Sequence, residues 1–332
     1  MFPLPFLSFG MGVFLWIWLL VKIPEQVRND GQVVRNDGLL VLFWNLENFF
    51  DYRDGGTGKS DAEFSAAGDR HWTRKRFYAK CNAVAKALLW TGDRYGRLPD
   101  VIGVAEVENA FVLRRLVQAT ALRKLDYGIV HRESPDGRGI DVALLYRKSV
   151  FDTLSVSLRK LYDADGTPLR TRGILCVTMV RKADGGVLHF LVNHHPSKYG
   201  GATASARRRA IAAGTLRHVA DSLGGEIVAM GDFNDTPGNP LYDTLSGPLA
   251  CKAADLYRAG RGSIRFDGKW ELIDLFFASH DLPCEMDIVE IPFLMTDDRT
   301  NAGRKPLRTY SGPRYTGGVS DHLPVMLRIW KK

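Results

Sequence analysis

Residues 227–235 read IVAMGDFND, an apolar run that passes directly into glycine, aspartate and asparagine. A short run of this kind, bounded by glycine and aspartate, is typical of a buried β-strand. Asp232 and Asn234 therefore stand where a strand enters a loop, which is where sites assemble in α/β proteins. For one such group a turn-capping role is the more ordinary explanation. The pattern has to recur before it indicates a site.

The same pattern recurs at four more places along the chain. Each time an apolar run adjoins carboxylate, amide or histidine side chains: NLEN (45–48) after 40–44, EVEN (106–109) after 101–105, HHP (194–196) after 188–193, and Asp321 with His322 before 323–329. Five polar strand ends together outweigh the capping explanation. We interpret them as parts of one site.

The remaining pattern predicts packed sheets with helices outside them. Further strand-like runs lie at 142–146, 174–180 and 272–278, and Asp267-Gly268 between two short apolar runs predicts a hairpin. Apolar spacing predicts helices over 73–90, 110–122 and 202–223, the first with Thr73 as its N-cap. Residues 40–332 show no linker-like break, so they are predicted to form a single domain.

The amino-terminal residues differ from the rest. Residues 1–22 are almost entirely apolar up to Lys22, which suits a hydrophobic anchor or signal-like segment. No basic residue precedes this stretch and no small-residue cleavage site follows it, so an uncleaved anchor fits better. Residues 23–39 contain a short repeat without apolar periodicity and are predicted to be a linker. The expected location is membrane-anchored or exported, or cytoplasmic if the start of the chain is misassigned.

Charge and cysteine content narrow the chemistry. Lys and Arg number 45 against 37 Asp and Glu, a net charge of +8. The first 40 residues carry three charges of each sign, so the excess lies on residues 41–332 and favours an anionic partner such as nucleic acid. The four cysteines are far apart, which argues against a zinc site or a redox dithiol.

The residue types at the strand ends define a reaction class. Carboxylate and amide oxygens suit Mg²⁺ or Mn²⁺, and also Ca²⁺, while a histidine beside an aspartate suits proton transfer near neutral pH. Hydrolysis of a phosphate ester with the help of a metal needs these parts. A serine nucleophile in G-x-S-x-G, a P-loop and a dinucleotide-binding glycine motif are all absent from the sequence.

In this order the motifs resemble those of the endonuclease/exonuclease/phosphatase superfamily. WNLEN (44–48), EVEN (106–109), GDFND (231–235), Ile273-Asp274 and Ser320-Asp321-His322 carry the resemblance, which spans nearly all of residues 41–329. ESPD (133–136), GIDVALLY (139–146) and NHHPS (193–197) further resemble a bacterial endonuclease-like branch. The resemblance implies an α/β fold, a four-layer α/β sandwich of two packed, mostly antiparallel β-sheets flanked by helices.

The resemblance also implies a role for each matching residue. The metal ligands would be Glu106 first, with Asn45, Glu47 and Asp321 near the ion. His322 would act as general base or phosphate-contacting acid, paired with Asp274; Asp232 would activate water or stabilise the leaving group; Asn234 and His194 would contact the scissile phosphate. The division of roles between Asp232 and His322 stays open. His195 stands where this branch is expected to have an aromatic residue.

These observations predict a magnesium- or manganese-dependent phosphodiesterase. It would cleave DNA or RNA by water attack without a covalent intermediate, as a monomer, with membrane contact only through its amino terminus. Arg138 and Arg172, each next to a glycine, are predicted to bind substrate, together with basic residues 299–314. Two alternatives stay open: a phospholipid phosphodiesterase or phosphomonoesterase of the same fold, and a sandwich that binds phosphate without catalysis.

Overall fold

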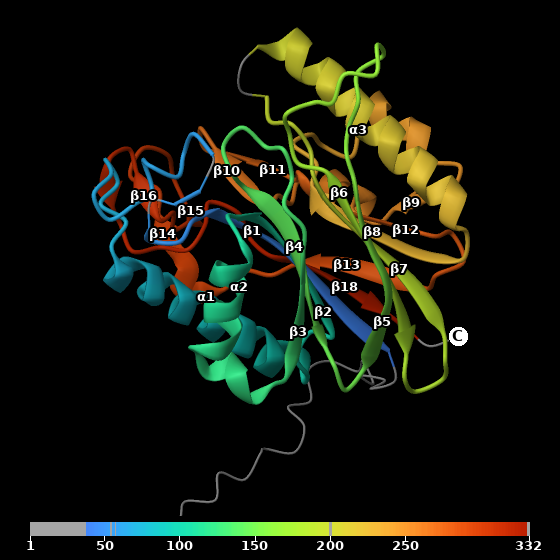
Figure 1. Cartoon of the computed structure of the whole chain (residues 1–332), viewed down its shortest axis with the longest axis horizontal. Helices are drawn as coiled ribbons and strands as arrows, with labels where there is room; N and C mark the ends of the chain where they lie inside the picture. Colours follow the sequence, from blue (N-terminus) through green and yellow to red (C-terminus); the bar gives the residue numbers. More distant parts are fainter. Residues whose placement is uncertain (1–37, 54, 57, 199–200, 331–332) are drawn as a thin grey trace, which may run out of the picture. The chain divides into compact units, whose positions relative to one another are not determined.

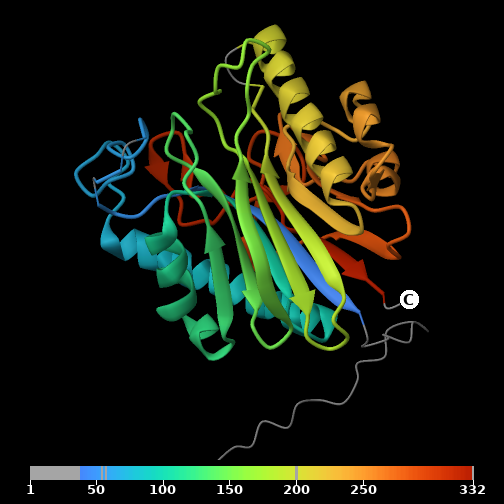
Figure 2. The same ribbon diagram turned by 45° about the vertical axis from the view of Figure 1, so that its right-hand side comes forward.

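The computed structural model describes residues 38–53, 55–56, 58–198 and 201–330. Two six-stranded sheets pack face to face, and helices cover their outer faces (Figures 1 and 2). Helices α1 (Arg74–Tyr95) and α2 (Ala110–Gln118) lie on one sheet and α3 (Ala202–Leu223) lies on the other. The predicted four-layer α/β sandwich is confirmed. The predicted anchor, 1–22, falls outside the described residues, among which no helix has the length and apolarity to cross a membrane.

The first sheet contains both ends of the described chain. Its strands, in spatial order, are β13 (Cys284–Ile288), β18 (Val325–Ile329), β1 (Leu39–Phe49), β2 (Val101–Val107), β4 (Asp141–Arg147) and β3 (Tyr127–His131). Strands β1 and β2 run parallel, and every other neighbouring pair is antiparallel.

The second sheet has the same design. Its strands, in spatial order, are β5 (Phe151–Arg159), β6 (Ile174–Arg181), β7 (Val187–His194), β8 (Glu226–Asp232), β12 (Asp274–Ala278) and β9 (Ala250–Cys251). Strands β7 and β8 form its one parallel pair. Each sheet therefore contains one pair of neighbouring strands whose carboxyl ends lie at the same edge.

Strand β1 is apolar at successive positions because both of its faces are buried. Val41 and Phe43 pack into the core between the sheets, whereas Leu40, Leu42 and Trp44 pack into the core beneath α1 and α2. Both faces of the sheet are covered, so the side chains that point to either face must be apolar. The strand extends to Phe49, beyond the predicted apolar run, because the NLEN segment stays beside β2 with a shift in register.

Helix ends follow local capping chemistry. Thr73 caps α1 as predicted, accepting a hydrogen bond from the amide of Arg76. Asn109 caps α2 through the amides of Phe111 and Val112. The predicted helix 110–122 ends earlier, at Gln118, and a separate 3₁₀ turn follows it. The side chain of Thr120 caps this turn by accepting a hydrogen bond from the amide of Leu122.

Small elements complete the described chain. They are the turns η1 (Ala121–Lys124), η2 (Pro240–Leu245) and η3 (Pro292–Leu294), the helix α4 (Ala254–Arg258) and the two-stranded ribbons β10 (Ile264–Phe266) with β11 (Lys269–Glu271), β14 (Met295–Asp297) with β15 (Arg304–Pro306), and β16 (Tyr310–Ser311) with β17 (Arg314–Tyr315). The predicted hairpin at Asp267-Gly268 is confirmed: both residues have positive φ, as a tight two-residue turn requires.

Candidate active site

The two parallel strand pairs explain why the five motifs meet. NLEN and EVEN follow the neighbouring strands β1 and β2, while HHP and GDFND follow β7 and β8. Carboxyl ends of parallel neighbours lie at the same edge of a sheet. Cross-contacts between the sheets, such as Asn45 Nδ2 donating to Asp232 Oδ2 at 3.0 Å, show that both edges form one site.

Three titratable groups lie at the centre of this site. Nδ1 of His322 lies 2.7 Å from Oδ2 of Asp274, and Nε2 of His322 lies 3.9 Å from Oδ2 of Asp232. Ligand atoms of all three residues fall within 4.8 Å of one another, and all three are buried. Ser263 Oγ donates to the same Asp274 oxygen at 2.6 Å, so the aspartate is held from two sides.

The charges of these groups are set by their neighbours. Burial alone would lower the pKa of His322, but the carboxylates of Asp274, Asp321 and Asp232 raise it well above its ordinary value. Burial raises the pKa of Asp232 to about 7, with the Asp274 carboxylate adding to the effect. These surroundings favour the imidazolium form of His322 and bring the titration of the Asp232 carboxyl toward neutral pH.

Glu106 stands at the end of β2 with its backbone in the left-handed region, φ 59°. Its Oε2 accepts from the amide of Asn48 at 2.8 Å, and Arg138 approaches both carboxylate oxygens at 3.4 Å. Burial would raise the pKa of Glu106, but Arg138 and the Asn48 amide lower it below its ordinary value. Glu106 is therefore an anion with one oxygen, Oε1, in only long contacts.

The guanidinium group of Arg308 contacts the carboxylates of both Glu47 and Asp321. Its Nε donates to Glu47 Oε1 at 2.8 Å and its Nη2 lies 3.1 Å from Asp321 Oδ2. The other Glu47 oxygen accepts from the amide of Thr309 at 2.7 Å. Both Glu47 oxygens are thus engaged, whereas Asp321 is only partly buried. Sequence reasoning had placed Arg308 only within a basic segment.

A buried lysine supports this corner and was not identified from the sequence. Lys80 on α1 is 2% exposed and donates to the carbonyl of Glu47 at 2.5 Å and to Thr309 Oγ1 at 2.8 Å. Burial lowers its pKa to about 8. Its spacing from Phe77 and Val84 places it on the apolar face of α1, and this spacing is the local signal that could have identified it.

The two histidines of the HHP motif differ. His194 is buried with Nε2 at 3.6 Å from Asp232 Oδ2 and 3.9 Å from Glu106 Oε1, so it faces the site. His195 instead packs its ring on Phe233 at 4.6 Å, and neither ring nitrogen has a hydrogen-bond partner. Its side chain therefore occupies an aromatic position in the core, as the resemblance had led us to expect of that position.

The remaining predicted residues lie around this centre. Asn234, φ 51°, donates from Nδ2 to the carbonyl of His195 at 3.0 Å, and its amide donates to Asp232 Oδ1 at 2.9 Å. Arg138 is partly exposed beside Glu106. Arg172 is 8% exposed and contacts Asp136 at 3.1 Å and the His195 carbonyl at 2.9 Å, so it faces inward.

Backbone strain concentrates here. Four of the seven non-glycine residues with positive φ in the described part of the chain belong to the motifs: Glu47, Asn48, Glu106 and Asn234. Asparagine tolerates left-handed backbone, but for glutamate it is unfavourable and persists where surrounding structure holds it, which is common at functional sites. Glu47 and Asn48 lie in the irregular part of β1, Glu106 lies near the end of β2, and Asn234 follows β8.

The donor chemistry fits a hard divalent cation. Glu106, Asp321, Glu47 and Asn45 offer carboxylate and amide oxygens, the ligands that Mg²⁺ and Mn²⁺ take. The guanidinium groups of Arg138 and Arg308 lie against the carboxylates of this set, so they balance charge that a bound cation would neutralise. Glu106 Oε1 is the least engaged of these oxygens.

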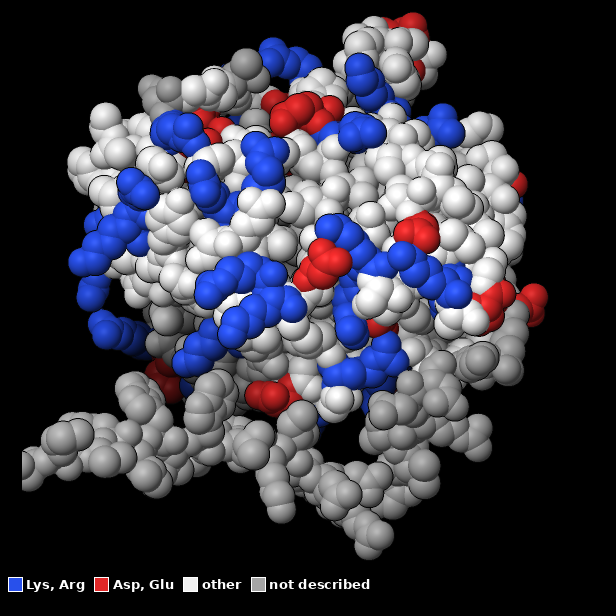
Figure 3. Space-filling view, turned by 60° about the horizontal axis from the view of Figure 1, so that its bottom comes forward, with Lys and Arg blue, Asp and Glu red and all other residues white. Residues whose placement is uncertain are grey.

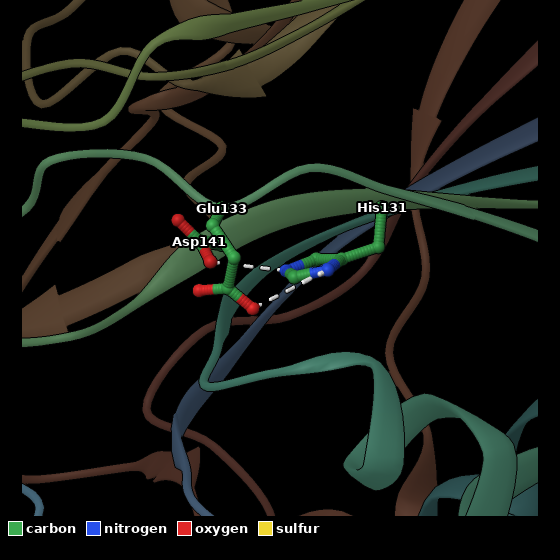
Figure 4. Close-up of side chains that lie close together, drawn as sticks. All are labelled: His131, Glu133 and Asp141. Atoms are coloured by element: carbon green, nitrogen blue, oxygen red, sulfur yellow. Dashed lines mark hydrogen bonds and ion pairs between the residues drawn. The ribbon is translucent and has the colours of Figure 1, made fainter. Parts of the chain in front are cut away.

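A second histidine–carboxylate cluster lies on strands β3 and β4 (Figure 4). His131 Nε2 is 3.0 Å from Asp141 Oδ2, and its Nδ1 is 3.8 Å from Glu133. The other Asp141 oxygen accepts from Ser134. Both Asp141 oxygens are thus engaged in fixing the base of the loop that carries Arg138 to Glu106.

Comparison with known proteins agrees with this geometry. The model of the Endonuclease/Exonuclease/phosphatase family matches residues 40–331. The chain belongs to this family. Its members are hydrolases that act on phosphoester bonds. No curated protein matches the chain.

Solved structures of this family share the fold at low sequence identity. The human Nocturnin catalytic domain with bound sulfate has a TM-score of 0.56 at 16% identity, covering 89% of this chain and 94% of that one. TDP2 of D. rerio with a single-strand DNA product has a TM-score of 0.54 at 14% identity, covering 89% and 99%. The mannosyl-6-phosphatase Bt3783 of Bacteroides thetaiotaomicron VPI-5482 has a TM-score of 0.53 at 18% identity, covering 88% and 100%.

Proposed function

We propose that this protein is a magnesium- or manganese-dependent phosphodiesterase that hydrolyses DNA or RNA by direct attack of water. The observation that carries the proposal is the grouping of His322, Asp274 and Asp232 within 4.8 Å, beside Glu106. A carboxyl whose pKa is raised to about 7 and an imidazole whose pKa is raised well above its ordinary value form a suitable base and acid pair near neutral pH.

Each group has a task in this proposal. Asp232, whose pKa is near neutrality, takes the proton of the attacking water. His322 stays protonated on Asp274 and donates from Nε2 to a phosphoryl oxygen as negative charge develops there. Asn234 and His194 flank the same space and hold the phosphate. Because water is the nucleophile, no covalent intermediate forms.

Glu106, Asp321, Glu47 and Asn45 would hold the cation. Bound there, it would polarise the phosphoryl oxygen and neutralise charge on the leaving group. Asn45 also donates to Asp232, so it orients the base toward the same space. Arg308 bridges Glu47 and Asp321 and keeps both carboxylates at this corner.

Charge favours nucleic acid over a small phosphate ester. The fold alone does not choose, because TDP2 with a DNA product and a mannosyl-6-phosphatase both share it. The net charge of +8 suits a polyanion. Lys and Arg side chains are also more prominent than Asp and Glu on the face that Figure 3 brings forward, the side of the molecule on which β1 begins.

The test is turnover of a substrate panel with Mg²⁺, Mn²⁺ or Ca²⁺: plasmid DNA, RNA, sphingomyelin vesicles and inositol phosphates. We expect nucleic-acid cleavage that a chelator abolishes and Mg²⁺ or Mn²⁺ restores. Activity should fall steeply with salt, because each neutralised phosphate contributes a slope of roughly −0.7 to −0.9 in log affinity against log salt. Full activity in excess chelator would exclude the metal mechanism.

The same panel separates the alternatives. Removing residues 1–38 should leave nucleic-acid cleavage unchanged, since that segment carries no motif and no net charge. Vesicle hydrolysis that falls on truncation, without nucleic-acid cleavage, would favour a membrane-anchored phospholipid phosphodiesterase. Binding of nucleic acid with no turnover under any metal would favour the non-catalytic sandwich.

A further inference from the structure

The hairpin β10–β11 is joined directly to the catalytic pair. Ser263, the residue before β10, donates its Oγ to Asp274 and accepts at its carbonyl from the amide of Leu323 at 2.7 Å. The next residue, Ile264, forms an antiparallel bridge with His322 itself. The root of the hairpin is therefore fixed by hydrogen bonds to both sides of the His322–Asp274 pair.

This bridge determines where the hairpin tip points. Residues opposite each other in an antiparallel pair place their side chains on the same face, and so do residues two apart along a strand. His322, Ile264 and Phe266 consequently share one face. Phe266 lies two residues beyond the bridge, or about 7 Å along the strand from the level of His322.

Phe266 is unusual for its exposure. It is 74% exposed, the most exposed large apolar side chain among the described residues. It stands at the last position of β10, before the Asp267-Gly268 turn. A tight turn of this kind needs no phenylalanine beside it, and the side chain contributes nothing to the core.

Phe266 also forms one wall of a recess of about 340 Å³. The recess is lined by Arg265, Phe266, Asp267, Asp298, Thr300, Asn301 and Lys305. Its polar floor is already ordered, because Lys305 Nζ donates to Asp298 Oδ1 at 2.9 Å and Arg265 Nη1 donates to the carbonyl of Arg304 at 3.1 Å. Gly268 lets the hairpin turn lie against the side chain of Asn301, since a Cβ at this position would be 2.8 Å from that side chain.

We infer that Phe266 is a stacking surface for the nucleobase next to the scissile phosphate. The inference rests on the proposed function, and it names the part of the substrate that is recognised. An exposed aromatic ring, held at a fixed distance from the acid that contacts the phosphate, offers a π-face that any base can use. The ordered polar recess beside it accommodates the edge of the same base.

The test uses substrates with a single phosphodiester bond: the thymidine dinucleotide and two analogues in which one or the other base is replaced by hydrogen. For the wild-type enzyme, loss of the base that stacks should lower kcat/KM roughly tenfold. Phe266→Ala should have a roughly tenfold lower kcat/KM than the wild type on the full dinucleotide. Removal of that base should then cause no further loss of kcat/KM in this variant. Phe266→Trp should keep wild-type discrimination.

Trp330→Ala is the matched control. Trp330 is a partly exposed aromatic beyond the far end of β18, the strand that follows His322. This variant should discriminate between the substrates as the wild type does. Equal cost of base removal in the wild type and Phe266→Ala would overturn the stacking role while leaving the proposed function standing. Hydrolysis of p-nitrophenyl phosphate without cleavage of any dinucleotide would overturn both.

Discussion

His322 Nδ1 and Asp274 Oδ2 lie 2.7 Å apart in a buried hydrogen bond between residues 48 positions apart in sequence. This bond holds the imidazole through Nδ1, and the backbone amide of His322 donates to Ser320 Oγ at 3.0 Å, which fixes the backbone that carries the ring. Only one ring nitrogen, Nε2, is left to face Asp232 and the substrate space. The pair therefore fixes both the charge and the direction of the imidazolium.

Removing either partner should reveal this dependence. His322→Ala is expected to lower kcat roughly 10³-fold, and Asp274→Asn somewhat less, because the imidazole would lose its orientation and part of its positive charge. The double variant should be little slower than His322→Ala, since coupled groups act as a unit. Steady-state cleavage kinetics of the four proteins measure this cycle.

Asp297→Asn provides the matched control, because Asp297 is a highly exposed aspartate outside the site. Its kcat should equal that of the wild type. Losses that add in logarithm for the double variant would show that His322 and Asp274 act separately.

Glu106→Gln tests the metal site. The amide keeps the shape of the side chain but removes the charge that would face the cation, so Mn²⁺ affinity should fall by roughly 100-fold. The thermal unfolding midpoint should stay near that of the wild type. Calorimetric titration of Mn²⁺ measures the affinity, with Glu285→Gln, an exposed glutamate on β13, as the control. Unchanged Mn²⁺ affinity would remove Glu106 from the metal site.

The architecture was predictable because its signals are local. The continuous apolar runs at β1 and β8 are buried on both faces, and the polar residues that follow them lie at one sheet edge. The Asp267-Gly268 turn and the Thr73 cap depend only on neighbouring residues. Motif order then indicated which strand ends converge.

Several features of the site were not predictable because they depend on distant partners. Lys80 lies 229 positions from Thr309, and Arg308 lies 261 positions from Glu47. Neither pairing leaves a mark in local sequence. The short ribbons β14–β15 and β16–β17 were likewise missed, because strands of two or three residues lack a periodic pattern.

Lys80→Met should weaken both the fold and the metal site. Methionine keeps the apolar stem but leaves the Glu47 carbonyl and Thr309 Oγ1 without their buried donor, which costs about 1–3 kcal/mol in unfolding free energy. Misplacement of Glu47 should also lower Mn²⁺ affinity. Lys75→Met, an exposed lysine on the same helix, should change neither quantity. Wild-type stability and Mn²⁺ affinity in Lys80→Met would contradict this supporting role.

His195 makes stability depend on pH. Burial, and then the charges of Arg172 and Arg209, lower its pKa from 6.5 to about 3. In the unfolded chain the imidazole binds a proton below about pH 6.5, whereas in the folded protein it stays neutral until about pH 3. The unfolded state therefore binds more protons in this window, and stability falls as the pH falls.

His195→Phe should remove this dependence while keeping an aromatic ring on Phe233. From pH 6.5 to 5, the wild type should lose about 1.6 kcal/mol more unfolding free energy than the variant, because the unfolded imidazole is half protonated at pH 6.5 and almost fully protonated at pH 5. Urea unfolding at several pH values gives both curves. His218→Gln, an exposed histidine on α3, should leave the dependence unchanged. Parallel curves for the wild type and His195→Phe would mean that His195 takes up a proton equally well in the folded protein.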